Sequence, residues 1–143
     1  TITGKKIGIL GFSFKANTND TRESSAIMIC KELLNEGCNL IIYDPKVEKE
    51  QIEKDLSDKQ DNKYKTNFKE EGNVLLANEI NDAFEFTDCV IVMTEWKDFS
   101  TIDWNLASKK MRKPGWVFDT RNIVNETKVQ ASGLNLWVVG KNP

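Results

Sequence analysis

Short, continuous apolar runs recur along this 143-residue chain and alternate with stretches of helical periodicity. The clearest runs are Lys6–Leu10, Asn39–Tyr43, Asp88–Thr94 and Gly115–Asp119. A strand that is apolar at nearly every position is buried on both faces, which is typical of parallel sheets covered by helices. Shorter strands are expected at residues 73–77 and 136–139. We therefore predict one α/β domain, a Rossmann-like three-layer sandwich with a mostly parallel sheet.

The segments between the strands carry helix signals. Asp20 followed three residues later by Glu23 has the pattern of a capping box, so the first helix is expected to begin near Thr21. Gly37 supplies its stop, and the two strands that flank this helix should form a right-handed βαβ unit. Further helices are expected over residues 78–86, 103–111 and 126–132.

Residues 46–72 differ in composition from the rest of the chain. Most of them are charged or polar, and apolar residues are sparse, without a sustained period. A segment of this kind cannot bury enough apolar surface to offset its ordering entropy. We interpret it as a charged surface excursion of the single domain 1–143, with short helical pieces and the highest mobility of the fold.

Charge and composition exclude several classes of protein. The net charge is −2 and the chain lacks histidine, which argues against nucleic acid or a membrane as a partner and against triads and zinc sites built on imidazole. No apolar run has the length of a membrane span. The three cysteines, Cys30, Cys38 and Cys89, are scattered in apolar surroundings, which indicates reduced core thiols in a cytosolic protein and no metal site.

Candidate binding residues follow the ends of three predicted strands. In a parallel sheet, ligands bind beyond the carboxyl ends of the strands. Phe14 and Lys15 follow the first strand, Glu95 follows the strand over 88–94, and Arg121 follows the strand over 115–119. Two cations and an aromatic ring at one rim suit an anionic, ring-bearing ligand. The alternative is that Phe12 and Phe14 only close the core and that the cations are solvated.

A dinucleotide-binding fingerprint is missing from the first βα turn. That fingerprint places three glycines where the pyrophosphate approaches the backbone and the helix N-terminus. Here Gly11 stands alone, and the helix is expected about ten residues later. Asp44, at the end of the second strand, imitates the acid that binds a ribose, but without the glycines we interpret it as a turn former before Pro45.

Ordered sequence blocks over nearly the whole chain resemble the carboxy-terminal domain of the UDP-glucose/GDP-mannose dehydrogenase family. The similarity is closest to eukaryotic UDP-glucose 6-dehydrogenases. The blocks are Gly-Phe-Ser-Phe-Lys at 11–15, Asn-Asp-Thr-Arg-Glu-Ser at 19–24, Tyr-Asp-Pro-Lys-Val at 43–47, Thr-Glu-Trp at 94–96 and Phe-Asp-Thr-Arg-Asn at 118–122.

The resemblance implies the UDP-binding part of an NAD-dependent enzyme that oxidises UDP-glucose to UDP-glucuronate in the cytoplasm. It assigns Phe14, Lys15 and Arg121 to the UDP-sugar, and Arg22 to an NAD held mainly by an amino-terminal domain that lies outside this sequence. It also implies a homo-oligomer, and it places the catalytic residues in the amino-terminal and central parts, so that this chain alone is expected to be inactive. Thr120 departs from the family pattern, which has glycine there.

Three alternatives remain open from the sequence. The chain could belong to a GDP-mannose or UDP-N-acetylmannosamine dehydrogenase, because these share the Phe-Lys and Arg-Glu-Ser blocks. It could also be a stand-alone, non-catalytic nucleotide-binding module, or a purely structural interaction domain with no ligand.

Overall fold

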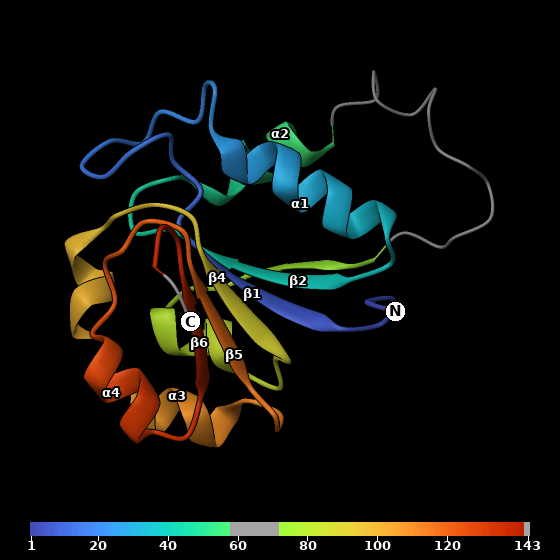
Figure 1. The fold of residues 1–143 in the computed structure, drawn as a ribbon. Coiled ribbons are helices and arrows are strands. Elements are labelled where there is room, and N and C mark those ends of the chain that lie inside the picture. Colours follow the sequence, from blue (N-terminus) through green and yellow to red (C-terminus); the bar gives the residue numbers. More distant parts are fainter. Residues whose placement is uncertain (58–71, 142–143) are drawn as a thin grey trace.

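The computed structural model describes residues 1–57 and 72–141. In the described ranges a single six-stranded sheet runs in the order β3-β2-β1-β4-β5-β6, and every neighbouring pair is parallel (Figure 1). The strands are β1 (Lys6–Leu10), β2 (Asn39–Tyr43), β3 (Val74–Leu76), β4 (Cys89–Val92), β5 (Trp116–Asp119) and β6 (Asn135–Val138). The predicted Rossmann-like α/β class is confirmed.

Helices cover both faces of this sheet, which gives the three predicted layers. The helical elements are α1 (Ser25–Asn35), α2 (Lys49–Leu56), the 3₁₀ helices η2 (Ile80–Phe84) and η3 (Lys97–Thr101), α3 (Trp104–Lys110) and α4 (Glu126–Ala131). Figure 1 shows α1 and α2 together on one face and α3 and α4 on the other. The buried residues accordingly form two clusters, one between the sheet and α1–α2 and one between the sheet and η2, α3 and α4.

The first helix begins later than the sequence predicts. The capping box of Asp20 and Glu23 does not form: the Asp20 carboxylate accepts the N–H of Arg22 at 2.9 Å, and Glu23 has a φ of 60°. Ser24 is the N-cap instead, and its hydroxyl also donates to the carbonyl of Phe12 at 2.8 Å. This long-range bond fixes the helix start to the end of the first strand, which a local pattern does not reveal.

Other elements agree with the sequence apart from their bounds. The segment 78–86 forms only the short η2, because Glu85 is already extended, with a ψ of 113°, and Phe86 then takes a positive φ of 56°. Within 46–72, α2 is one of the expected helical pieces and buries Ile52 against the core. Residues 58–71 of that segment lie outside the described residues. The high mobility predicted for 46–72 concerns mostly these residues. None of the described helices is long and apolar enough to cross a membrane.

The three cysteines are free thiols in or beside the core. Cys30 and Cys38 are buried and belong to the cluster under α1, and Cys89 is partly buried on β4. Burial raises the pKa of the Cys30 and Cys89 thiols to about 12, and it raises the pKa of Cys38 as well. Since the thiolate is the nucleophilic form, a raised pKa disfavours a nucleophilic role for these cysteines at neutral pH.

Gly11, which follows β1, has to be a glycine for two reasons. Its φ of 96° lies in the left-handed region, and a Cβ built on it would stand 2.5 Å from the side chain of Thr94. The loop after β1 can therefore press directly against the loop after β4.

We predict that Gly11→Ala destabilises the fold more than Gly133→Ala does. Gly133 has a similar φ of 87°, but a Cβ there meets nothing within 4 Å. Both variants incur the left-handed strain of about 1–2 kcal/mol, and only Gly11→Ala adds overpacking of about 1–3 kcal/mol. Urea unfolding measures both free energies, and equal losses would contradict the close contact between the two loops.

Candidate functional site

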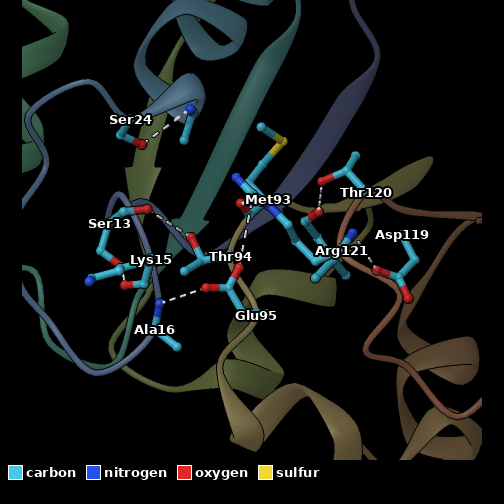
Figure 2. A network of polar contacts seen from close by, with 12 residues as sticks. Ser13, Lys15, Ala16, Ser24, Met93, Thr94, Glu95, Asp119, Thr120 and Arg121 are labelled. Atoms are coloured by element: carbon cyan, nitrogen blue, oxygen red, sulfur yellow. Dashed lines mark hydrogen bonds and ion pairs between the residues drawn. The ribbon is translucent and has the colours of Figure 1, made fainter. Parts of the chain in front are cut away.

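The carboxyl edge of the sheet is the expected place for a ligand, and the strand order locates the site along it. The first three strands extend the sheet in one direction and the last three in the other, so the order reverses between β1 and β4. Ligands of open parallel sheets bind outside the strand ends at such a reversal. The loops that follow β1, β4 and β5 come together there (Figure 2).

The loop after β4 connects its two neighbours. Thr94 is fully buried, and its hydroxyl donates to the carbonyl of Ser13 in the β1 loop at 3.0 Å. On the other side, the carbonyl of Met93 accepts a hydrogen bond from Nε of Arg121 at 2.9 Å. One strand end thus orients both the β1 loop and the predicted arginine.

Glu95 makes a second connection between the same loops. Its Oε1 accepts the backbone N–H of Ala16 at 3.0 Å, and its Oε2 lies 3.7 Å from a terminal nitrogen of Arg121. Both side chains of this ion pair are about one third exposed, at 37% for Glu95 and 35% for Arg121. The guanidinium is therefore oriented on its inner side and open to solvent on its outer side.

A buried aspartate shapes the turn that presents Arg121. Asp119 is inaccessible to solvent, and its Oδ1 accepts the N–H of Arg121 at 3.0 Å. Its Oδ2 accepts the N–H groups of Ile123 and Val124 at 2.8 and 2.9 Å. Three backbone donors on one carboxylate hold this turn in a single conformation.

Thr120 is compatible with the turn although the family pattern has glycine there. The left-handed residue of the turn is Asn122, with a φ of 58°, and Thr120 is not among the residues with positive φ. The Thr120 hydroxyl donates to the carbonyl of Val92 at 2.5 Å and so joins β4 to the turn. The backbone freedom that glycine offers is not needed at position 120.

Asp44 has a larger part than the turn former predicted from the sequence. Its Oδ1 does accept the N–H groups of Lys46 and Val47 and forms the turn before α2. Its Oδ2 also accepts the N–H groups of Phe12 and Ser13 at 2.8 and 3.0 Å. The backbone donors of the first βα turn, which face a pyrophosphate in dinucleotide-binding folds, are therefore bonded to a protein carboxylate.

Phe14 and Lys15 lie on the exposed part of the β1 loop. The Phe14 ring is 44% exposed, so it does not close the core as the alternative interpretation supposed, whereas Phe12 does. The carbonyl of Lys15 accepts the Ser13 hydroxyl at 2.9 Å, which fixes the backbone there. Figure 2 shows Lys15 and Arg121 at the same rim, on either side of Thr94 and Glu95.

Arg22 lies on the outer part of the β1 loop, with a side chain that is 88% exposed. Its Nε and NH2 groups donate to the two carboxylate oxygens of Asp20, at 3.0 and 2.8 Å. This guanidinium lowers the pKa of Asp20 from 3.8 to about 2. Arg22 is thus paired with Asp20, whereas Arg121 is bonded to Met93 and faces Glu95.

Hollows elsewhere on the surface do not include the predicted cations. A hollow of about 550 Å³ is lined by Tyr43, Asp103 and other residues in and beside η2 and η3. A second hollow, of about 510 Å³, lies along α1 beside Met28. Lys15 and Arg121 line neither of them. The side chains of Phe14, Glu95 and Arg121 at the rim are between about one third and one half exposed. Among the residues of the two described ranges, no group of three His, Cys, Asp or Glu could hold a metal ion.

Sequence reasoning identified the exposed residues of the rim but not the residues that orient them. The double role of Glu95 and the bonds of Asp44 and Asp119 were missed, although all three stand at or just beyond a predicted strand end. An acidic residue at the end of a buried strand is a usable signal, because turn N–H groups there need acceptors.

The parallel sheet and the β1 turn at its carboxyl edge define the chain as a Rossmann-like α/β domain without a dinucleotide loop. A family model described as "UDP-glucose/GDP-mannose dehydrogenase family, UDP binding domain" matches residues 8–126, and the chain belongs to this family. The resemblance inferred from the ordered blocks is thereby confirmed.

Curated relatives agree with the family. The chain is 39% identical over 141 residues to UDP-glucose 6-dehydrogenase of Drosophila melanogaster and 41% identical over 146 residues to that of Bos taurus. Each match covers 99% of this chain but only 29% and 28% of the relative. The chain therefore spans less than a third of the length of these relatives.

Solved structures share the fold at low sequence identity. An NDP-N-acetyl-D-galactosaminuronic acid dehydrogenase from Methanosarcina mazei Go1 matches 99% of this chain and 26% of its own, with a TM-score of 0.74 and 18% identity. A UDP-glucose dehydrogenase from Pyrobaculum islandicum matches 96% of this chain and 25% of its own, with a TM-score of 0.67 and 22% identity. At this identity the likeness concerns the fold alone.

We predict that Asp20 titrates near pH 2 and that Arg22→Ala returns its pKa toward 3.8. The pKa is lower in the folded chain, so the pair stabilises the fold above pH 3.8, and this contribution is lost as the pH falls toward 2. Carboxyl chemical shifts followed by NMR between pH 1.5 and about 6, a range that brackets ordinary aspartate values, measure it. A wild-type pKa near 3.8 would show that the ion pair does not persist in solution.

Proposed function

We propose that this chain is the UDP-binding domain of an NAD-dependent UDP-glucose 6-dehydrogenase, which oxidises UDP-glucose to UDP-glucuronate. The observation that carries the proposal is the pair of Lys15 and Arg121 on strand-end loops at the reversal of strand order, in a chain of this family. Relatives at 39 to 41% identity from an insect, a plant and mammals are all named UDP-glucose 6-dehydrogenase. This favours UDP-glucose over GDP-mannose, UDP-N-acetylmannosamine or a stand-alone module.

The roles of the three rim residues follow from their chemistry. The Arg121 guanidinium offers two parallel donors to phosphate oxygens, whereas the Lys15 ammonium acts as a mobile point charge. The half-exposed Phe14 ring presents an apolar face to the ligand. Because the backbone donors of the β1 turn are bonded to Asp44, the diphosphate is held by these side chains and not by a glycine loop.

The residues of this chain do not fit a resident NAD. The β1 turn has no glycine fingerprint, residues 11–24 separate β1 from α1, and Asp44 is engaged by the turn itself. We assign NAD to another part of the polypeptide. Arg22, exposed at the outer end of the β1 loop, would contact the cofactor from this side.

The chain contributes binding rather than chemistry. It has no histidine, and its buried cysteines have raised pKa values. The nucleophile and the base of the reaction would belong to the remainder of the same polypeptide, which would also close the rim into a cleft. Reduced thiols are consistent with a cytoplasmic enzyme, and the full-length protein is proposed to be a homo-oligomer.

We predict that Arg121→Ala weakens UDP binding about ten- to a hundredfold, because charge-assisted hydrogen bonds contribute roughly 1.5–3 kcal/mol each. Lys15→Ala should weaken it less, and Arg121→Lys should recover only part of the loss. Isothermal calorimetry of the chain with UDP, GDP and NAD measures this, with UDP expected to bind tightest.

Arg112 provides a matched control for Arg121. It precedes β5 at the opposite edge of the sheet, and its side chain is 64% exposed beside Asp88. Arg112→Ala removes the same charge and should leave UDP binding unchanged; Lys5, before β1, serves likewise for Lys15. Unchanged UDP affinity in both Lys15→Ala and Arg121→Ala, with intact circular dichroism, would refute the site.

We also predict that the purified 143-residue chain produces no NADH from UDP-glucose and NAD. It lacks both a dinucleotide loop and a reactive nucleophile. Absorbance at the NADH band, with a complete UDP-glucose dehydrogenase as positive control, tests this. Turnover that persists in a preparation free of other dehydrogenases would contradict the assignment of chemistry to other parts of the polypeptide.

A further inference from the structure

Glu95 is an acidic residue in the middle of a rim that is proposed to bind an anion. Its two carboxylate oxygens have different partners: Oε1 accepts the N–H of Ala16 at 3.0 Å, and Oε2 lies 3.7 Å from NH1 of Arg121 (Figure 2). A carboxylate beside a diphosphate site opposes binding by repulsion. Glu95 would therefore need to make a favourable contribution to the site that offsets this repulsion.

Arg121 does not need Glu95 to be oriented. Its backbone N–H is bonded to Asp119, and its Nε donates to the carbonyl of Met93 at 2.9 Å. Glu95 faces only a terminal nitrogen of the guanidinium, at a distance longer than a hydrogen bond. The nitrogen that Glu95 faces, NH1 of Arg121, is one to which a phosphate oxygen would bind.

The β1 loop, in contrast, depends on Glu95 for one of its few attachments beyond Phe14. The N–H of Ala16 has the Glu95 carboxylate as its acceptor, and the next residue, Asn17, takes a left-handed φ of 65°. Lys15 lies immediately before this point. Together with the Ser13 hydroxyl on the Lys15 carbonyl, the bond between Glu95 and Ala16 holds the Lys15 backbone relative to Arg121.

We propose that Glu95 is a positioning residue and the counter-charge of the UDP site, an inference that rests on the proposed function. Before UDP binds, its Oε2 balances the charge of Arg121. When UDP binds, the diphosphate replaces Oε2 at the guanidinium, while Oε1 stays on Ala16 and keeps the β1 loop in place. Glu95 then has two separable effects: its charge lowers the affinity for UDP, and its bond to Ala16 raises it.

Glu95→Gln separates these effects, because the amide oxygen can still accept the Ala16 N–H while the charge is gone. We expect Glu95→Gln to bind UDP about three- to tenfold more tightly than the wild type at low salt, and the gain to shrink as salt screens the charge. Glu95→Ala loses the charge and the loop bond together, so it should bind at least about threefold more weakly than Glu95→Gln.

Calorimetry with UDP at low and high ionic strength measures both variants. Glu53→Gln, on the exposed face of α2, is the control, since it changes the net charge by the same amount away from the rim. Its UDP affinity should equal that of the wild type. A purely structural role for Glu95 would weaken UDP binding in Glu95→Ala but leave Glu95→Gln at the wild-type affinity, at low and at high salt alike.

The outcomes distinguish this inference from the proposed function. If the wild type binds UDP through Arg121 but Glu95→Gln binds no more tightly, or gains equally at high salt, the counter-charge role is overturned and the UDP site stands. If the wild type binds no UDP, both are overturned. Should Glu95→Ala fail to fold, Glu95→Gln and its salt dependence decide the question alone.

Discussion

Backbone N–H groups at the carboxyl ends of parallel strands need acceptors, and in this domain two aspartates supply them. Asp44 accepts N–H groups from its own turn and from the β1 loop, and Asp119 accepts three from the turn that follows β5. In dinucleotide-binding folds, such donors at the first turn are left for a pyrophosphate. Here they are already bonded, so an anion at this edge has to be held by side chains.

This constraint explains the composition of the rim. A chain with a net charge of −2 has no general attraction for anions, so the attraction has to be local. Arg121 and Lys15 stand on loops that Asp119 and Asp44 hold rigid, and Thr94 and Glu95 connect those loops across the end of β4. The rim is held by bonds within the domain, and its side chains are partly exposed. This exposure fits the proposal that another part of a longer polypeptide completes the site.

The sequence predicted the sheet well because each strand is an uninterrupted apolar run whose burial on both faces leaves few alternatives. It also placed Lys15 and Arg121 correctly at one edge, since the carboxyl ends of parallel strands must meet. It failed where long-range bonds decide local structure. Ser24, bonded to Phe12, displaces the predicted capping box of Asp20 and Glu23, and the distant contacts of Asp44 leave no mark in its neighbouring residues. The mobility predicted for 46–72 concerns mainly residues 58–71, which lie outside the described part of the chain.

The most direct test of the account is a map of UDP-induced amide shifts by NMR on the isotope-labelled chain. The account predicts that the largest shifts fall on the three loops at the rim, at Lys15, Ala16, Glu95, Arg121 and Asn122. The amino edge of the sheet, including Lys5 and Arg112, should be unaffected. Largest shifts in the hollow along α1, at Ile27 and Met28, would contradict the central claim that side chains at the carboxyl edge hold the nucleotide.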